Sequence, residues 1–128
     1  MKKLLLILLA IIFAVNIKTN AEDFYSVYNG DTIYYNITSS VSPRTVEVTF
    51  RGISNEAYAN EYSGAVSIPD SVLYSGNYYK VNSIGANAFW YCTELTSLTI
   101  PNSVNSIGNN SFYYLPRFFQ LPLLFLIL

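Results

Sequence analysis

The sequence predicts a mainly β protein in which a short solenoid of stacked repeats follows an N-terminal β-hairpin cap. Three observations lead to this prediction. The segment 81–92 recurs at 104–115, 23 residues later, with 8 of 12 aligned positions identical. Ile68–Val72 is echoed by Ile100–Val104, with four of five residues shared. Ahead of both, apolar and polar residues alternate in Thr45–Phe50, which is typical of a half-buried strand.

Residues 1–21 have the pattern of a secretory signal peptide. Lys2 and Lys3 precede an uncharged apolar run, Leu4–Val15, and small residues lead up to a cleavage position after Ala21. A membrane anchor is the less favoured alternative, because this run is shorter than the roughly 20 residues that span a bilayer. We therefore expect the protein to be secreted or displayed at the cell surface.

Residues 22–65 are predicted to form a β-rich cap. Runs that carry Tyr and Ile flank Asn29-Gly30-Asp31, a tripeptide that favours a tight hairpin turn. In Thr45–Phe50 the apolar residues are predicted to face inward, and Glu47 and Thr49 outward. The polar segment 52–64 is predicted to be a long loop. Such a cap would cover the apolar end of a solenoid.

Residues 66–115 are predicted to form a leucine-rich repeat solenoid. A period in the twenties with apolar residues at i, i+3 and i+5, here Leu95, Leu98 and Ile100, is typical of this architecture. We expect strands at Val66–Ile68 and Ser97–Ile100, paired in parallel because they belong to stacked coils of the same hand. An insertion at about 73–80 contains Ser-Gly-Asn and is predicted to form a small hairpin.

Individual positions within the repeats carry further expectations. Gly85 and Gly108 are expected at turns where glycine adopts a positive φ. Phe89 is expected to fill the interior of its coil. Cys92, the only cysteine, aligns with Leu115, which favours a packing role over a reactive or intermolecular thiol.

Residues 116–128 form an apolar tail that breaks the repeat. In the 23-residue register Phe118, Leu121 and Leu123 keep the inward positions apolar, but Pro122 falls inside the expected strand. Two explanations remain open. The chain is a truncated or frame-shifted member of a longer family, or the tail is a true end that docks onto the open edge of the solenoid.

Three motifs within the repeats connect the chain to a known family. They are Ile100–Val104, Ile84–Phe89 and Cys92–Leu98. They resemble the BspA-like leucine-rich repeats of bacterial surface proteins, closely over 81–115 and more loosely back to about Asp31. The resemblance implies attachment to host proteins or other cells, extracellular matrix proteins among the candidate partners.

The composition argues against catalysis and against several classes of partner. The chain has no histidine, no glycine-rich phosphate loop and only dispersed acidic residues, so we expect no enzyme activity, no cofactor and no metal site. After signal cleavage four basic residues remain against eight acidic ones, a formal net charge of −4. Such a chain lacks the basic face that nucleic acids or anionic membranes require.

The outward strand face is the predicted binding surface. Ser67 and Thr99 align at a 32-residue step, and Ser97 shares the outward face of its strand with Thr99. A merely solvated strand face is one alternative, and a contact surface on the tyrosine-bearing cap is another. Two functions accordingly stay open: a protein-binding adhesion scaffold, or a structural remnant without binding activity of its own.

Overall fold

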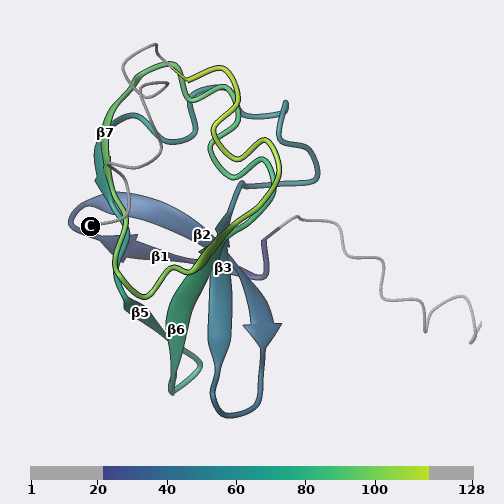
Figure 1. Cartoon of the computed structure of the whole chain (residues 1–128), viewed down its shortest axis with the longest axis vertical. Helices are drawn as coiled ribbons and strands as arrows, with labels where there is room; N and C mark the ends of the chain where they lie inside the picture. Colours follow the sequence, from purple (N-terminus) through teal and green to yellow (C-terminus); the bar gives the residue numbers. More distant parts are fainter. Residues whose placement is uncertain (1–21, 116–128) are drawn as a thin grey trace, which may run out of the picture.

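The structure is a computed structural model that describes residues 22–115 (Figure 1). The predicted signal peptide and the predicted break of the repeat at 116–128 lie outside the described residues. Among residues 22–115, no helix has the length and apolar character needed to cross a membrane. The described part contains eight strands: β1 (Phe24–Tyr28), β2 (Asp31–Ser39), β3 (Thr45–Thr49), β4 (Gly64–Ser67), β5 (Ser71–Tyr74), β6 (Asn77–Ile84), β7 (Leu95–Thr99) and β8 (Ser106–Ile107).

The larger sheet runs from the cap into the coils. Its strand order is β1-β2-β3-β6-β5, and β8 pairs with the end of β6. β1 and β2 form the predicted hairpin around Asn29 and Gly30, whose φ values of 52° and 90° suit a two-residue turn. β3 and β6 are parallel, with Val48 opposite Ile84. Cap and solenoid therefore share one continuous sheet.

A second, two-stranded sheet is formed by β4 and β7. β4 pairs with β7 in parallel, with Val66 opposite Leu98 and Ser67 opposite Thr99, which confirms the predicted pairing and its 32-residue step. β5 and β6 form the predicted inserted hairpin, with the turn at Ser75-Gly76. Figure 1 shows the turns of successive coils running side by side. Backbone hydrogen bonds join them, such as Phe89 N to Ser111 O at 2.8 Å.

A column of aromatic rings fills the coils. Phe89 is fully buried, with its ring centroid 4.7 Å from that of Tyr62 and 5.5 Å from that of Phe112. The prediction that Phe89 occupies the coil interior is therefore confirmed. Tyr62 supplies the ring of the first coil. It lies in the irregular segment 50–63, which does not show the 23-residue repeat.

The predicted alternation in β3 is only partly correct. Val46 and Val48 are buried as predicted, but Thr49 is also buried, with 2% of its surface exposed. The Tyr62 hydroxyl donates a 2.6 Å hydrogen bond to the Thr49 carbonyl, so the tyrosine lies against this end of the strand. Phe50 lies beyond the end of β3 and is only half-buried.

The expected reason for the repeated glycines is wrong. Neither Gly85 nor Gly108 has a positive φ. In the middle and last coils the left-handed positions belong to an asparagine and a tyrosine, Asn87 and Tyr91 in the middle coil. What excludes a side chain is the close approach of neighbouring coils. A Cβ on Gly108 would lie 2.5 Å from the Ala86 nitrogen. The glycine repeat thus reflects the spacing between coils.

We predict that Phe89→Ala lowers the free energy of unfolding by about 3–5 kcal/mol, because it empties the middle of the aromatic column. Urea denaturation measures this difference. Tyr78→Ala is the matched control, since Tyr78 is exposed on the β5–β6 hairpin and should change stability little. Equal stability of Phe89→Ala and the parent protein would contradict a core role.

We predict that Gly108→Ala costs about 1–3 kcal/mol, because the new methyl group meets backbone atoms that no rotamer change can move. Gly85→Ala should cost less, since its nearest obstruction is the flexible Glu47 side chain. Thermal unfolding of both variants beside Asn109→Ala, an exposed neighbour, tests the ranking. A larger loss for Gly85→Ala than for Gly108→Ala would show that coil spacing is not the constraint.

Candidate functional site

The structure brings the three predicted strand-face residues together. Ser67 and Thr99 lie opposite each other on β4 and β7, and Ser97 lies opposite Ala65 on the same two strands. Ser97 and Thr99 are exposed, and Ser67 is half-buried. Their partners on the other face, Val66 and Leu98, are buried. The face is thus small and polar, and its role in binding stays a prediction.

A second surface is formed by aromatic side chains at the turns of two successive coils. Trp90 and Tyr91 follow the buried Phe89, and Tyr113 and Tyr114 follow Phe112 one repeat later. Each Phe points into its coil, and the next two rings are directed outward. Tyr91 and Tyr114 adopt φ values of 55° and 59°, a left-handed conformation that bends the chain at this point. We call these four outward residues the aromatic ladder.

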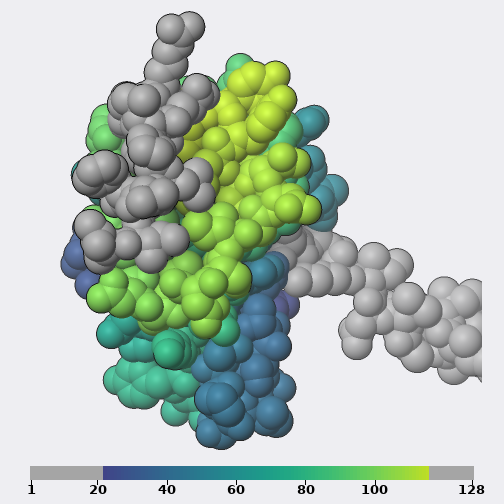
Figure 2. Space-filling view, in the orientation of Figure 1, coloured from purple at the N-terminus to yellow at the C-terminus, as the bar shows by residue number. Residues whose placement is uncertain are grey.

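The rings of the aromatic ladder contact one another across the two coils. The Trp90 and Tyr113 rings stack with centroids 4.5 Å apart, and the Tyr91 and Tyr114 rings meet edge-on at 5.4 Å. These contacts pack the rings of the two coils against one another. The three tyrosines nevertheless remain 45–56% exposed. The coil that carries Tyr113 and Tyr114, yellow-green in Figure 2, reaches the near surface of the molecule.

A pocket of about 310 Å³ adjoins the aromatic ladder. Rings from the ladder form one side of it, and the segment 50–63 forms the other. Its lining residues in the described part are Asn55, Glu56, Ala59, Trp90, Tyr91 and Tyr114. The lining therefore combines aromatic residues with one acidic and one amide residue, which suits a ligand with both apolar and polar character.

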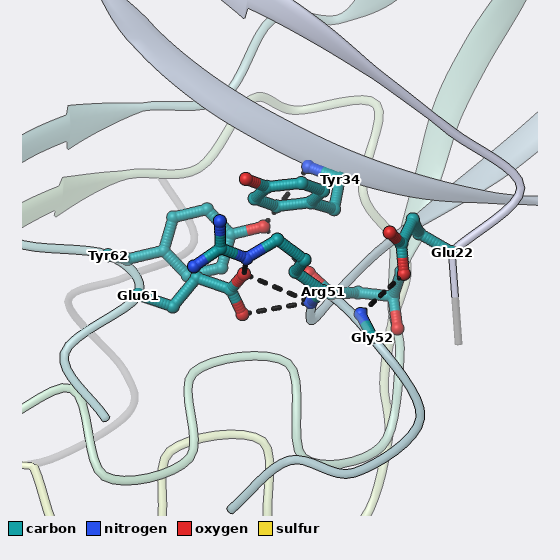
Figure 3. Close-up of polar contacts among 7 residues, drawn as sticks. Glu22, Tyr34, Arg51, Gly52, Glu61 and Tyr62 are labelled. Atoms are coloured by element: carbon teal, nitrogen blue, oxygen red, sulfur yellow. Dashed lines mark hydrogen bonds and ion pairs between the residues drawn. The ribbon is translucent and has the colours of Figure 1, made fainter. Parts of the chain in front are cut away.

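The segment 50–63 is held in place by a buried carboxylate (Figure 3). Both Glu61 oxygens accept hydrogen bonds from the Arg51 backbone N–H, at 3.0 and 2.9 Å, and Oε1 lies 3.4 Å from Arg51 Nε. Glu22 Oε2 accepts the Gly52 N–H at 2.7 Å. The Arg51 guanidinium carbon lies 3.8 Å from the Tyr58 ring centroid. These contacts fix the two ends of the segment that forms the pocket wall.

The buried position of Glu61 changes the pKa of its carboxyl group. Its side chain is only 5% exposed, and burial raises the pKa of Glu61 from its ordinary 4.5 to about 6. The hydrogen bonds from the Arg51 backbone and the nearby Arg51 charge lower the pKa of Glu61, but burial outweighs them. The carboxylate consequently titrates in a mildly acidic range.

Cys92 has the expected packing environment. It is a free cysteine, buried in the core, and burial raises the pKa of its thiol to about 11. The thiol is therefore neutral at pH 7 and does not present a nucleophilic thiolate. Among residues 22–115, no group of three or more His, Cys, Asp or Glu side chains is placed to hold a metal ion.

Trp90 and Tyr113 were not predicted as contact residues. A signal was present, because both repeats carry three consecutive aromatic residues, Phe89–Tyr91 and Phe112–Tyr114. A narrow coil has room for one such ring inside, so the other two must lie outside. Where they meet the segment 50–63 could not be predicted, since that segment has no repeat pattern.

We predict that stability falls as the pH rises from about 4.5 to about 6, because the folded protein binds a proton at Glu61 more tightly than the unfolded chain. The stabilisation that this tighter proton binding gives to the folded protein is fully present below pH 4.5 and is lost as the pH rises through about 6. Glu61→Gln should remove about 1–2 kcal/mol of this pH dependence. Urea denaturation of both proteins across this range measures it, and equal slopes would contradict the assignment.

Comparison with known proteins places this geometry in a family. The family described as "BspA type Leucine rich repeat region (6 copies)" matches residues 51–121, more than half of the chain. No curated protein matches the chain.

Two solved structures of repeat proteins are similar. A leucine-rich repeat protein from Bacteroides ovatus is 36% identical, with a TM-score of 0.52, over 70% of this chain and 20% of that one. A leucine-rich cell surface protein from Faecalibacterium prausnitzii is 25% identical, with a TM-score of 0.46, over 70% of this chain and 21% of that one. The chain thus spans about a fifth of each solved relative. With its paired coils and its match over residues 51–121, the chain belongs to the BspA-type leucine-rich repeat family.

Proposed function

We propose that the chain is an exported repeat scaffold that acts at the cell surface or after secretion, where it binds other proteins without catalysis. The observation that carries this proposal is the aromatic ladder, four adjoining rings at the surface of two coils. Tyrosine and tryptophan contribute disproportionately to binding energy at protein interfaces, because one side chain offers both apolar area and a polar tip.

Export is supported by the sequence of residues 1–21, in which two lysines precede an apolar run and a small-residue cleavage position. The resemblance to BspA-like surface proteins implies partners among extracellular matrix proteins or proteins of host and other cells. The absence of catalysis is supported by the lack of histidine in the chain and by the neutral, buried thiol of Cys92.

The aromatic ladder is a stronger candidate contact surface than the strand face. Ser67, Ser97 and Thr99 are small, so each would contribute little apolar area to an interface. The rings of Tyr91, Tyr113 and Tyr114 are large, and their mutual contacts restrict their motion before any partner arrives. Rings that are already ordered lose less conformational entropy on binding.

We predict that Tyr91→Ser/Tyr113→Ser/Tyr114→Ser weakens binding to immobilised fibronectin, laminin or collagen by about tenfold or more, because it removes the hot-spot rings. Surface plasmon resonance measures the change. A matched triple variant, Tyr25→Ser/Tyr28→Ser/Tyr78→Ser, removes exposed tyrosines of the cap and of the β5–β6 hairpin and should bind like the parent protein. Circular dichroism verifies that both variants stay folded.

A third variant tests the strand face directly. Ser67→Glu/Ser97→Glu/Thr99→Glu places three charges on the β4–β7 surface. If this variant alone loses binding, the contact surface is the strand face, and the assignment of binding to the aromatic ladder is wrong. If the Tyr25/Tyr28/Tyr78 variant alone loses binding, the contact surface lies on the cap or on the β5–β6 hairpin. If the folded parent protein binds none of the matrix proteins, the proposed adhesion function fails and the structural-remnant hypothesis is favoured.

A further inference from the structure

The pocket beside the aromatic ladder combines two features that recognise a cation. Trp90, Tyr91 and Tyr114 line it, and the face of an aromatic ring carries the negative part of the ring quadrupole. Glu56 is the charged residue of its lining in the described part. A positively charged group in this space would lie beside three aromatic residues and one acidic residue.

The charge balance of the described residues also favours a cation. Residues 22–115 contain eight acidic side chains and three basic ones, Arg44, Arg51 and Lys80. Arg51 is paired with Glu61, and Arg44 and Lys80 lie together where β3 meets β6, with Lys80 N bonded to Arg44 O at 3.0 Å. None of these three cations lines the pocket. Among residues 22–115, the pocket lining therefore contains an acidic residue and no basic one, which suits a positively charged ligand group.

The same chemistry already holds a guanidinium elsewhere in the segment 50–63. Arg51 lies with its guanidinium carbon 3.8 Å from the Tyr58 ring centroid and 5.8 Å from that of Tyr34, while Glu61 supplies the carboxylate. Figure 3 shows Arg51 between Tyr34 and Glu61. The pocket offers the corresponding set, with Trp90, Tyr91 and Tyr114 as rings and Glu56 as carboxylate.

We propose that this pocket receives an arginine side chain from a protein partner, with the planar guanidinium against the aromatic ladder and its N–H groups donating to Glu56. Arginine suits the site because it stacks on aromatic faces and bonds to a carboxylate at the same time. This inference rests on the proposed protein-binding function and specifies the chemistry of the partner. A sugar ring stacked on the same aromatics is the competing occupant.

Trp90 makes the site directly observable, because it is the only tryptophan of the chain. We would titrate the folded protein with the peptide acetyl-Gly-Arg-Gly-amide and follow Trp90 fluorescence. The control peptide replaces arginine by citrulline, which keeps the shape and removes the charge. The arginine peptide should bind at least fivefold more tightly, with a saturable fluorescence change that weakens as salt is added.

Single substitutions then separate the parts of the site. Glu56→Gln should weaken binding of the arginine peptide about threefold and leave binding of the citrulline peptide unchanged. Tyr114→Leu should also weaken it about threefold, because an apolar side chain remains but the π face is lost. Tyr78→Leu, which changes an exposed tyrosine on the β5–β6 hairpin, should have no effect.

Three results would overturn the inference: equal affinity for the arginine and citrulline peptides, unchanged affinity in Glu56→Gln, or a saturable Trp90 response to cellohexaose but not to the arginine peptide. The last result would assign the pocket to carbohydrate. If the peptide fails while the Tyr91/Tyr113/Tyr114 variant still loses matrix binding, only the partner chemistry is wrong. If both fail, the proposed function fails with it.

Discussion

Tyr62 is the residue on which the junction of cap and solenoid depends. Its ring packs 4.7 Å from Phe89, and its hydroxyl accepts the Tyr34 N–H at 3.2 Å and donates to the Thr49 carbonyl at 2.6 Å. A buried hydroxyl without hydrogen-bond partners would cost stability, whereas here the hydroxyl acts both as donor and as acceptor. One side chain thereby joins β2 of the cap, the end of β3 and the aromatic column of the coils. Burial also raises the pKa of Tyr62 well above its ordinary value, so the hydroxyl keeps its donated proton.

The repeat geometry that builds the core also builds the candidate binding surface. The middle and last coils each direct one phenylalanine inward, Phe89 and Phe112, and turn at a left-handed tyrosine two residues later, so the following rings do not enter the coil. Because neighbouring coils are hydrogen-bonded turn to turn, as in Tyr91 N to Tyr113 O at 3.0 Å, the outward rings are brought into register. The outward rings are consequently held against one another by the same stacking that aligns the core, which favours recognition with little loss of entropy.

The segment 50–63 connects stability with recognition. It replaces a regular repeat turn in the first coil, and its two ends are tied by Glu61 to the Arg51 backbone and by Glu22 to Gly52. The same segment carries Tyr62 into the core and Asn55 and Glu56 to the pocket. A change of pH that protonates Glu61 therefore acts on a segment that serves both the fold and the candidate site.

The sequence alone determined the features that depend on local pattern. The repeat period predicted parallel coils with Ser67 opposite Thr99, and Asn29-Gly30 and Ser75-Gly76 predicted the hairpin turns, because turn chemistry and strand alternation are properties of neighbouring residues. Only the tertiary structure decided why Gly108 must be glycine, that Tyr62 completes the aromatic column, and that Glu56 and Trp90 line the same pocket. Those features depend on which distant segments approach one another. The segment 50–63 has no repeat pattern to indicate its neighbours, so its place became visible only once the coils were stacked.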